Sequence, residues 1–234
     1  MKIRALFFDV FGTLVDWRTC VARESAATLA PLGHDLDWLA FAAAWRDRYQ
    51  PAMAEVRSGA RAYVKLDVLH RENLEKILPD FGIRDLPEAA VAGLSARAWR
   101  KLDAWPDVVE GLRRLREKVL IAPCSNGNIS LMADLARHNS ISWDAVLGAE
   151  TARDYKPSAG VYDSACAAFD LPPDQCAMVA AHTRDLLAAQ KRGLKTIHIA
   201  RPDENGPGRG EAAPGAPVTI AARDLLQLCD ILPA

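Results

Sequence analysis

The chain has 234 residues, long enough for one α/β domain and a smaller inserted domain, and half of its residues are hydrophobic. Its 29 basic and 30 acidic side chains leave a formal net charge of −1, which gives no indication of a nucleic-acid-binding surface. No apolar run has the length of a membrane span, and the N-terminal Met-Lys-Ile-Arg lacks the pattern of a signal peptide.

The first predicted element is a short strand over residues 5–8, whose apolar sequence suits a strand buried on both faces of a parallel sheet. Asp9 follows directly, and Gly12 and Thr13 favour a tight turn with free backbone N–H groups. A carboxylate at the C-terminal end of a central parallel strand lies where open α/β sheets bind ligands, and it can act there as a nucleophile. The alternative is an Asp that only caps the following helix.

Residues 16–99 carry helical patterns and no strand pattern. Apolar residues recur at helical spacing in four stretches, and the Pro-Leu-Gly sequence at 31–33 ends the first of them. Pro51 is expected to kink or interrupt the second helix, and Pro87 is expected at the first position of the fourth. The four predicted helices cover residues 16–30, 35–57, 63–78 and 87–99.

From residue 100 onward, predicted strands alternate with predicted helices. The strands cover residues 119–123, 143–147, 176–181 and 196–199, with an edge strand at 218–221. The helices are one that opens at 105–107, followed by 129–138, 159–169, 184–192 and 224–232. A polar loop is predicted over 150–157, and a loop rich in Gly and Pro over 201–217.

This order of elements implies right-handed βαβ units and therefore a parallel sheet. The sequence predicts an α/β fold with a Rossmann-like, doubly wound core formed by residues 1–15 and 100–234. Residues 16–99 are predicted to form an all-helical cap domain, inserted after the first strand and lying over the active-site end of the sheet.

The sequence Asp9-Val-Phe-Gly-Thr13 resembles the first motif of the haloacid dehalogenase superfamily, Asp-x-(Asp/Tyr/Phe)-Gly-Thr. Phosphatases of that superfamily carry a second Asp two residues after the nucleophile, which protonates the leaving group, and this chain has Phe11 there. An aromatic residue at this position resembles the L-2-haloacid dehalogenase branch of the superfamily. A halide leaves as an anion and needs no proton, so the reaction does not require an acid there. The resemblance implies catalytic roles for Asp9 and Thr13 and places Phe11 at the substrate.

Ser125 and Asn126 follow the second predicted core strand and precede a helix whose first N–H groups favour an anion. They resemble the superfamily's second motif, which in the dehalogenase branch commonly reads Ser-Asn-Gly, as it does here. The resemblance implies that Ser125 holds the substrate carboxylate and that Asn126 helps to receive the halide. The alternative for Ser125 is a helix cap.

Lys156 lies in Asp-Tyr-Lys-Pro, after the third predicted core strand, and Tyr162 follows six residues later. Lys-Pro with a Tyr at this spacing resembles the third motif, whose lysine pairs with the nucleophilic Asp. An ammonium group close to Asp9 would keep the carboxylate ionised. Taken alone, Lys156 could also be a solvated surface lysine.

Asp185 resembles the second Asp of the fourth motif, Gly-Asp-x-x-x-Asp, whose two carboxylates help to hold Mg²⁺ in phosphatases. Ala181 stands at the first of those positions, which leaves a poor magnesium site, so no metal is expected. Ala180, His182 and Arg184 depart from the best-known dehalogenase pattern, which has Ser, Asn and an aromatic residue there. His182 could position the hydrolytic water, act as a base, or be merely a helix cap or a buried side chain.

Arg46 is the candidate from the predicted cap, where it follows Trp45. The dehalogenases have a Trp-Arg pair at this place, and its Arg faces the leaving halide. A guanidinium group offers several N–H donors and stays charged at any working pH. The alternative is an ordinary surface arginine.

The resemblance to type II L-2-haloacid dehalogenases implies a reaction in two steps without a cofactor. Asp9 displaces halide from C2 of a short (S)-2-haloalkanoic acid to form an ester, and water then releases an (R)-2-hydroxyalkanoic acid. Lys156 and Asp185 would hold the charges, and Tyr162 would line the substrate site. The alternatives are a phosphatase of the superfamily acting on a small phosphate ester, or a binding protein of the same fold that has lost catalysis.

The expected partners are a small haloacid and the released halide, with no nucleic acid and no membrane. Family members are often homodimers, so a homodimer is possible. The five cysteines are scattered, odd in number and without CxxC spacing, which favours reduced thiols and a cytoplasmic location.

Overall fold

The computed structural model describes residues 2–232 and contains one six-stranded sheet in the order β3-β2-β1-β4-β5-β6, in which every paired strand runs parallel. The strands are β1 (Ala5–Phe8), β2 (Leu120–Ser125), β3 (Leu147–Gly148), β4 (Cys176–Ala180), β5 (Lys195–Ile199) and β6 (Ile220–Ala222). The predicted doubly wound α/β sheet is confirmed, with β1 in the centre. Residues 1, 233 and 234, at the ends of the predicted core, lie outside the described residues.

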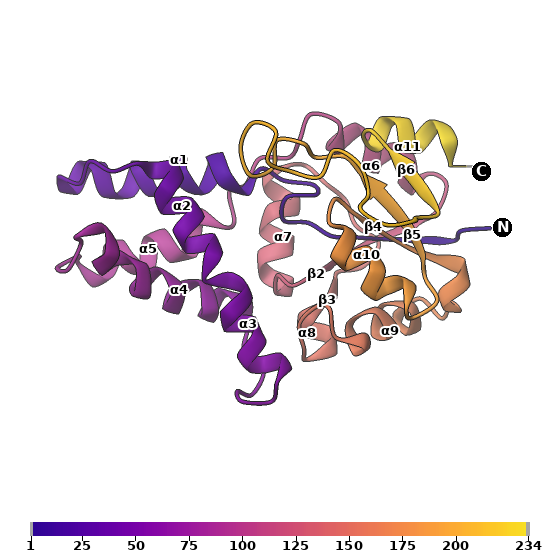
Figure 1. Cartoon of the computed structure of the whole chain (residues 1–234), viewed down its shortest axis with the longest axis horizontal. Coiled ribbons are helices and arrows are strands. Elements are labelled where there is room, and N and C mark those ends of the chain that lie inside the picture. Colours follow the sequence, from indigo (N-terminus) through magenta and orange to yellow (C-terminus); the bar gives the residue numbers. More distant parts are fainter. Residues whose placement is uncertain (1, 233–234) are drawn as a thin grey trace.

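Helices cover both faces of the sheet (Figure 1). They are α6 (Val108–Arg116), α7 (Ile129–His138), α8 (Ala149–Ala152), α9 (Ala159–Ala168), α10 (Thr183–Gln190) and α11 (Leu225–Ile231). Side chains of α6, α7 and α11 belong to one apolar cluster and side chains of α9 and α10 to another. Because successive strand residues point to opposite faces, Leu6 and Phe8 pack in the first cluster and Ala5 and Phe7 in the second. The short apolar run of β1 is therefore buried on both faces.

Residues 16–99, all of them described, contain helices and turns and no strand. The helices are α1 (Trp17–Leu29), α2 (Trp38–Asp47), α3 (Tyr49–Arg57), α4 (Leu66–Ile77) and α5 (Glu88–Ala98), with 3-10 turns at Ala30–Leu32 and Leu78–Phe81. They gather on the left of Figure 1, next to the end of the sheet that faces away from both chain termini. Their apolar sides join the cluster that also covers one face of the sheet.

The second predicted helix is interrupted, as expected, but the break lies at Arg48 and not at Pro51. A proline ring clashes with the carbonyl group four residues earlier, and for Pro51 that residue is Asp47, the last residue of α2. Pro51 itself then lies in the first turn of α3, where a missing N–H group costs little. The break reorients the chain between Arg46 on α2 and Tyr49 on α3.

Three other predictions need correction. Of the residues predicted as a strand at 143–147, only Leu147 belongs to one, β3. The Asp144 carboxylate accepts the Ile121 N–H at 2.9 Å, in place of the carbonyl group of a neighbouring strand. The loop predicted at 150–157 begins with the last three residues of the one-turn helix α8. The edge strand predicted at 218–221 begins two residues later and ends one residue later, as β6. A 3-10 turn at Pro173–Gln175 precedes β4.

All five cysteines lie within the described residues, are buried and are free of disulfide bonds. Among the described residues, none of the helices is both long and apolar enough to cross a lipid bilayer.

Candidate active site

Asp9 lies at the C-terminal end of β1, where its backbone position is fixed by the adjacent strand and by a tight turn. Its N–H group donates to the Val179 carbonyl oxygen at 2.9 Å, which continues the β1–β4 ladder by one residue. The turn is closed by the Leu14 N–H, which donates to the Val10 carbonyl oxygen at 2.9 Å. Gly12 has a φ of +85°, a conformation that L side chains rarely adopt. The turn thereby holds the Asp9 side chain at the edge of the sheet.

The Lys156 ammonium group bridges two buried carboxylates. Its Nζ lies 2.9 Å from Asp9 Oδ1 and also contacts Asp185 Oδ2, and the Tyr162 hydroxyl donates to Asp185 Oδ1 at 2.6 Å. Lys156 follows α8, while Asp185 lies in the first turn of α10. The structure therefore brings together four of the predicted site residues from segments that are far apart in the sequence.

Burial and charge act in opposite directions on this network. Burial raises the pKa of Asp9, but the Lys156 ammonium and the His182 ring outweigh it and hold that pKa well below its usual range. Burial lowers the pKa of Lys156, and the two carboxylates outweigh it, so the pKa of Lys156 is raised. Asp185 shows the reverse balance, because burial and the Asp9 charge raise its pKa more than Lys156 lowers it. Asp9 is thus the carboxylate that the site keeps ionised.

The His182 ring lies between Asp9 and a second buried acid, Glu204. Its Nδ1 is 3.0 Å from Asp9 Oδ2 and its Nε2 is 2.8 Å from Glu204 Oε2. The Thr13 hydroxyl also donates to Asp9 Oδ2, at 2.8 Å, and accepts the Ala181 N–H at 2.9 Å. Burial lowers the pKa of His182, but the two carboxylates outweigh it and raise that pKa to about 10. The ring therefore rests as an imidazolium between two anions.

A cavity of about 260 Å³ opens beside Asp9. All predicted site residues line it except Thr13 and Ser125. Thr13 is buried behind Asp9, and Ser125 lies fully buried at the end of β2, where its hydroxyl oxygen accepts the Gly127 N–H at 3.0 Å. Asn126 does line the cavity, and its side-chain oxygen accepts the Lys156 N–H at 2.8 Å.

Arg46 reaches the cavity from α2, and its guanidinium group is surrounded by aromatic rings. Its guanidinium carbon lies 4.1 Å from the centre of the Tyr49 ring, 5.5 Å from that of Trp17 and 5.9 Å from that of Phe11. Its Nη1 is buried without a hydrogen-bond partner among the described residues. A buried, charged donor without an acceptor is costly, which makes this N–H group a candidate for binding an anion.

Several residues of the site were not predicted. Tyr49, Gln50, Pro157, Arg184 and Glu211 also line the cavity. Glu204 lies behind His182, although it comes from the Gly- and Pro-rich loop at 201–217, whose sequence carries no periodic pattern. Two of these residues could have been suspected from their neighbours in the sequence, because Tyr49 lies one helical turn from Arg46 and Arg184 lies beside Asp185. Nothing in the sequence alone pointed to Glu204.

The donor set does not fit a divalent cation at the position where phosphatases of the superfamily bind Mg²⁺. Magnesium requires near-octahedral oxygen ligands. Here Asp9 and Asp185 share the Lys156 ammonium group, and Ala181 offers no side-chain ligand. Within residues 2–232, no group of three or more His, Cys, Asp or Glu side chains is arranged to hold a metal ion. That no cofactor is needed stays a prediction.

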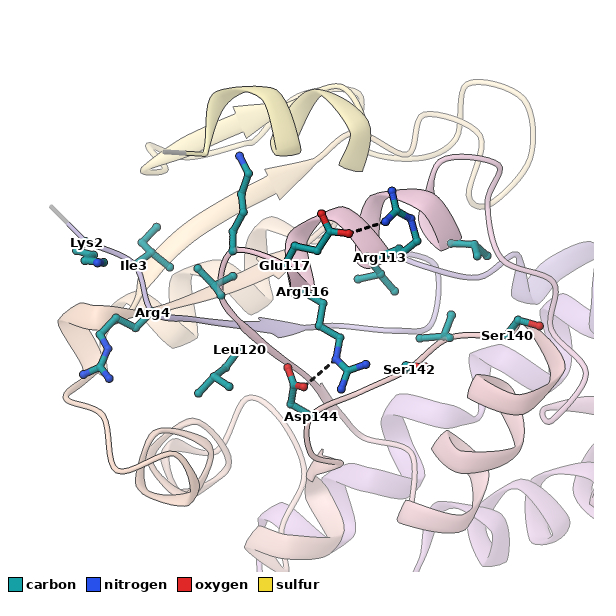
Figure 2. Close-up of a pocket in the computed structure, with 15 residues that line it drawn as sticks. Lys2, Ile3, Arg4, Arg113, Arg116, Glu117, Leu120, Ser140, Ser142 and Asp144 are labelled. Carbon is teal, nitrogen blue, oxygen red and sulfur yellow. Dashed lines mark hydrogen bonds and ion pairs between the residues drawn. The ribbon is translucent and has the colours of Figure 1, made fainter. Parts of the chain in front are cut away.

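A larger groove of about 870 Å³ lies at the opposite end of the sheet, around Arg4 and Leu120 (Figure 2). Two of its arginines pair with acids of the same groove: Arg113 Nη1 lies 2.5 Å from Glu117 Oε1, and Arg116 Nε lies 2.8 Å from Asp144 Oδ1. It holds the N-terminal ends of the strands, whereas α/β sheets bind ligands at the C-terminal ends. The smaller cavity beside Asp9 is therefore the candidate site.

The raised pKa of His182 predicts a loss of stability in alkali. The pKa is about 6.5 in an unfolded chain and about 10 in the folded protein. Below the first value both states hold the proton; between the two values only the folded state does, so stability falls as pH rises through this window. Because the side chain is 31% exposed, we expect a loss on the order of 2 kcal/mol.

Urea unfolding between about pH 6 and pH 10 measures this effect. The free energy of unfolding of the His182→Gln variant, subtracted from that of the parent at each pH, removes the contribution of every other titrating group. A variant whose free energy of unfolding falls as steeply with pH as that of the parent would contradict the assignment.

Comparisons with known proteins agree with this geometry. The profile of the haloacid dehalogenase-like hydrolase family matches residues 3–193. The solved structure of a defluorinating L-2-haloacid dehalogenase is 42% identical, with a TM-score of 0.96 over 99% of this chain and 96% of that one. That of a second L-2-haloacid dehalogenase is also 42% identical, with a TM-score of 0.93 over 98% of both chains.

Among curated proteins, (S)-2-haloacid dehalogenase 4A of Burkholderia cepacia is 29% identical over 219 residues, which cover 91% of this chain and 89% of that protein. The family profile spans most of the chain and includes Asp9, Lys156 and Asp185. The chain belongs to the haloacid dehalogenase-like hydrolase family.

Proposed function

We propose that this hydrolase is a dehalogenase that converts short (S)-2-haloalkanoic acids to (R)-2-hydroxyalkanoic acids and halide through an ester on Asp9. One observation carries the proposal. A buried carboxylate, held ionised by Lys156, opens onto a small cavity that also contains an N–H group of Arg46 with no hydrogen-bond partner within residues 2–232. This arrangement provides a nucleophile for carbon and a binding group for an anionic leaving group, without an acid at position 11.

In the first step, an oxygen of Asp9 attacks C2 of the substrate in line with the carbon–halogen bond. A new C–O bond forms, halide leaves with the bonding electrons, and the configuration at C2 is inverted. Arg46 is assigned to the halide, because its Nη1 is buried without a partner among the described residues and its position is fixed by the rings of Tyr49 and Phe11. Lys156 holds Asp9 ionised and in place, and Asp185 in turn holds the Lys156 ammonium group.

The substrate carboxylate is assigned to the end of β2. Ser125 ends this strand, and its hydroxyl lies beneath the cavity. Asn126, which is assigned with Arg46 to the halide, lines the cavity beside it. Because the Ser125 oxygen accepts the Gly127 N–H, its own O–H remains a donor for a carboxylate oxygen. The cavity volume of about 260 Å³ favours short acids over larger substrates.

We also propose that residues 16–99 act as a cap domain over a core of residues 1–15 and 100–234. The cap contributes Arg46, Tyr49 and Gln50 to the cavity wall, while the core contributes Asp9, Lys156 and Asp185. A nucleophile from one unit and a leaving-group site from the other would exclude water from the reacting carbon. A homodimer and a cytoplasmic location stay predictions.

The similar proteins support the substrate class. Two L-2-haloacid dehalogenase structures share 42% of their residues with this chain, and one of them is described as defluorinating. The Burkholderia cepacia relative is an (S)-2-haloacid dehalogenase. Chloro-, bromo- and fluoro-substituted short acids are accordingly the substrates to test.

Halide release from a panel of 2-haloacids, with chiral analysis of the 2-hydroxy acid, tests the proposal. We expect halide from the (S)-enantiomers of 2-chloro- and 2-bromopropionate, the (R)-product, and no effect of EDTA. Phosphate release from a panel of small phosphate esters, abolished by EDTA, would favour a phosphatase instead. Neither halide nor phosphate from pure, folded protein would favour a binding protein.

A further inference from the structure

We propose that Glu204 and His182 together form the base that activates the hydrolytic water in the second step, and that formation of the ester on Asp9 switches this base on. The inference rests on the dehalogenase function proposed above. Glu204 is a positioning residue, which orients the His182 ring and raises its pKa, and His182 transfers the proton.

The first support is the position of the ring. His182 Nδ1 lies 3.0 Å from Asp9 Oδ2, so it is adjacent to the carboxyl carbon that water must attack in the ester. The opposite ring nitrogen lies 2.8 Å from Glu204 Oε2. A ring fixed through one nitrogen by a carboxylate keeps its other nitrogen directed at the reacting group, which is the geometry that a general base requires.

The second support is the way the fold holds Glu204. Its side chain is 5% exposed, its Oε1 accepts the Trp17 Nε1–H at 3.2 Å, and its single ionic contact within residues 2–232 is His182. A Cβ atom at position 12 would lie 2.0 Å from Glu204 Oε1, so the turn after Asp9 leaves room for this acid only because it carries Gly12. A buried carboxylate with one charged partner is costly, and a sheltered place for it indicates a specific role.

The loop that carries Glu204 is itself anchored to the core. Arg201 forms a buried bidentate ion pair with Asp107, at 2.9 and 2.8 Å, and its Nε–H donates to the Thr13 carbonyl oxygen at 2.8 Å. The Glu204 N–H in turn donates to the Arg201 carbonyl oxygen at 3.3 Å. The acid is thus tied to the same turn that positions the nucleophile.

The charges of the site explain the switch. In the resting protein the two carboxylates keep His182 protonated, and an imidazolium cannot accept a proton. Alkylation of Asp9 removes one of the two negative charges, which lowers the pKa of His182 towards neutrality. The ring then loses its Nδ1 proton to solvent, keeps its Nε2 proton on Glu204, and presents a free lone pair to the ester.

Other charged groups surround the ring and do not change during this step. Lys156 lies on the opposite carboxylate oxygen of Asp9, and Arg184 and Glu211 line the same cavity. The pKa of the buried His198 is lowered, first by its burial, and His182 contributes to this shift, so the His198 ring is neutral near pH 7. The Asp9 charge is therefore the one contact of His182 that the chemistry itself removes.

The step balances in atoms and charge. A water O–H proton moves to His182 Nδ1 while the water oxygen bonds to the Asp9 carboxyl carbon. The bond from that carbon to the product oxygen then breaks, and the departing alkoxide takes the proton of the newly added hydroxyl group. Asp9 returns as a carboxylate and His182 as an imidazolium. One proton per turnover, lost from His182 after ester formation, accounts for the acid that hydrolysis of a carbon–halogen bond releases.

The inference is tested by separating the two steps in the His182→Gln and Glu204→Gln variants, with (S)-2-chloropropionate as substrate. Rapid-quench halide assays should show a burst close to one halide per active site, followed by turnover slowed about 100-fold or more. Intact-protein mass spectrometry should show the ester accumulating on the variants. Glu117→Gln is the matched control, because Glu117 is exposed in the distant groove of Figure 2, and it should behave as the parent.

The pH dependence separates a base from a hydrogen-bond donor. After a single turnover with excess parent protein, ester breakdown should become faster as pH rises and then level off, because only the neutral ring accepts a proton. In Glu204→Gln this rise should move to lower pH, since the ring loses its remaining carboxylate. Breakdown of the parent ester that becomes slower with rising pH would overturn the inference in favour of an imidazolium donor.

The outcomes distinguish this inference from the proposed function. If the parent releases no halide from any haloacid, the function itself fails. If the parent forms the ester but the folded variants hydrolyse it at the parent rate, or slow alkylation without accumulating ester, Glu204 and His182 are not the base. Circular dichroism and thermal unfolding establish that each variant is folded. If the His182→Gln variant is unstable, Glu204→Gln still tests the inference, because Gln keeps an acceptor for the Trp17 Nε1–H.

Discussion

The Asp9→Asn variant is expected to lose halide release by about 10⁴-fold or more while it keeps its fold. Asn is close in size to Asp and can still accept the Thr13 hydroxyl, so the turn after β1 has no reason to change. An amide is a far weaker nucleophile towards carbon than a carboxylate held ionised by Lys156. The measurement is halide release under saturating (S)-2-chloropropionate, with circular dichroism as the test of folding.

Asp230→Asn provides the matched control, because Asp230 is exposed on α11 and pairs only with Arg114 among the described residues. It should retain the parent rate. Mass spectrometry of the Asp9→Asn protein after the assay must exclude deamidation back to Asp. Halide release at the parent rate from protein whose side chain at position 9 is still the amide would remove Asp9 from the role of nucleophile.

Isotope labelling tests the same bond directly. With excess parent protein in ¹⁸O water, a single turnover should place the label in the Asp9 carboxylate and leave the first hydroxy acid unlabelled, because the product oxygen comes from Asp9. Peptide mass spectrometry locates the label. Label in the product of that first turnover would show that water, and not Asp9, attacks the substrate.

The Lys156→Met variant is expected to lose about 3–5 kcal/mol of stability and most of its activity. The ammonium group compensates two buried carboxylates, and its side chain is 7% exposed. Methionine fills a similar volume but leaves Asp185 without a cation and Asp9 with His182 as its one remaining cationic partner among the described residues. The pKa of Asp9 must then rise, because Lys156 is the largest influence that lowers it, and the acid limb of activity should move to higher pH.

Urea unfolding near pH 7 measures the loss of stability, with the exposed Lys101→Met as the matched control. Adding Asp185→Asn to Lys156→Met should recover part of the loss, since it removes the buried carboxylate that has lost its cation. A Lys156→Met protein as stable as the parent, or a double variant less stable than the single one, would contradict the assigned network.

The secondary structure could largely be predicted because it depends on local composition. The helix predicted at 129–138 coincides with α7, and the strand predicted at 5–8 coincides with β1. The prediction of a strand at 143–147 was wrong because the Asp144 side chain takes the place of a backbone acceptor. Strand propensity reflects residue types and does not include such a side-chain contact. The break after Asp47 lies one turn before the proline that causes it.

The candidate site could be predicted in part because its motifs follow strands. Asp9 and Asn126 come directly after a strand, and Asp185 lies at the start of the helix that follows β4. Lys156 comes later, in the loop after the one-turn helix α8 that follows β3. Parallel strands bring their carboxyl ends to one edge of the sheet, so these segments meet there. Ser125 follows the same logic but lies beneath the cavity and does not line it. Glu204 follows no such rule, because an irregular loop carries it back over the turn at Gly12.

By itself, the sequence determined the class of the fold, the order of its strands and helices, and the residue types that could act as nucleophile, ammonium partner and guanidinium group. These properties depend on hydrophobic periodicity and on side-chain chemistry, which are both local. Only the tertiary structure decided which charges meet: Lys156 with Asp9 across 147 residues, and His182 between Asp9 and Glu204. The protonation state of each group depends on the burial and the charges around it, and chain folding alone brings those neighbours together.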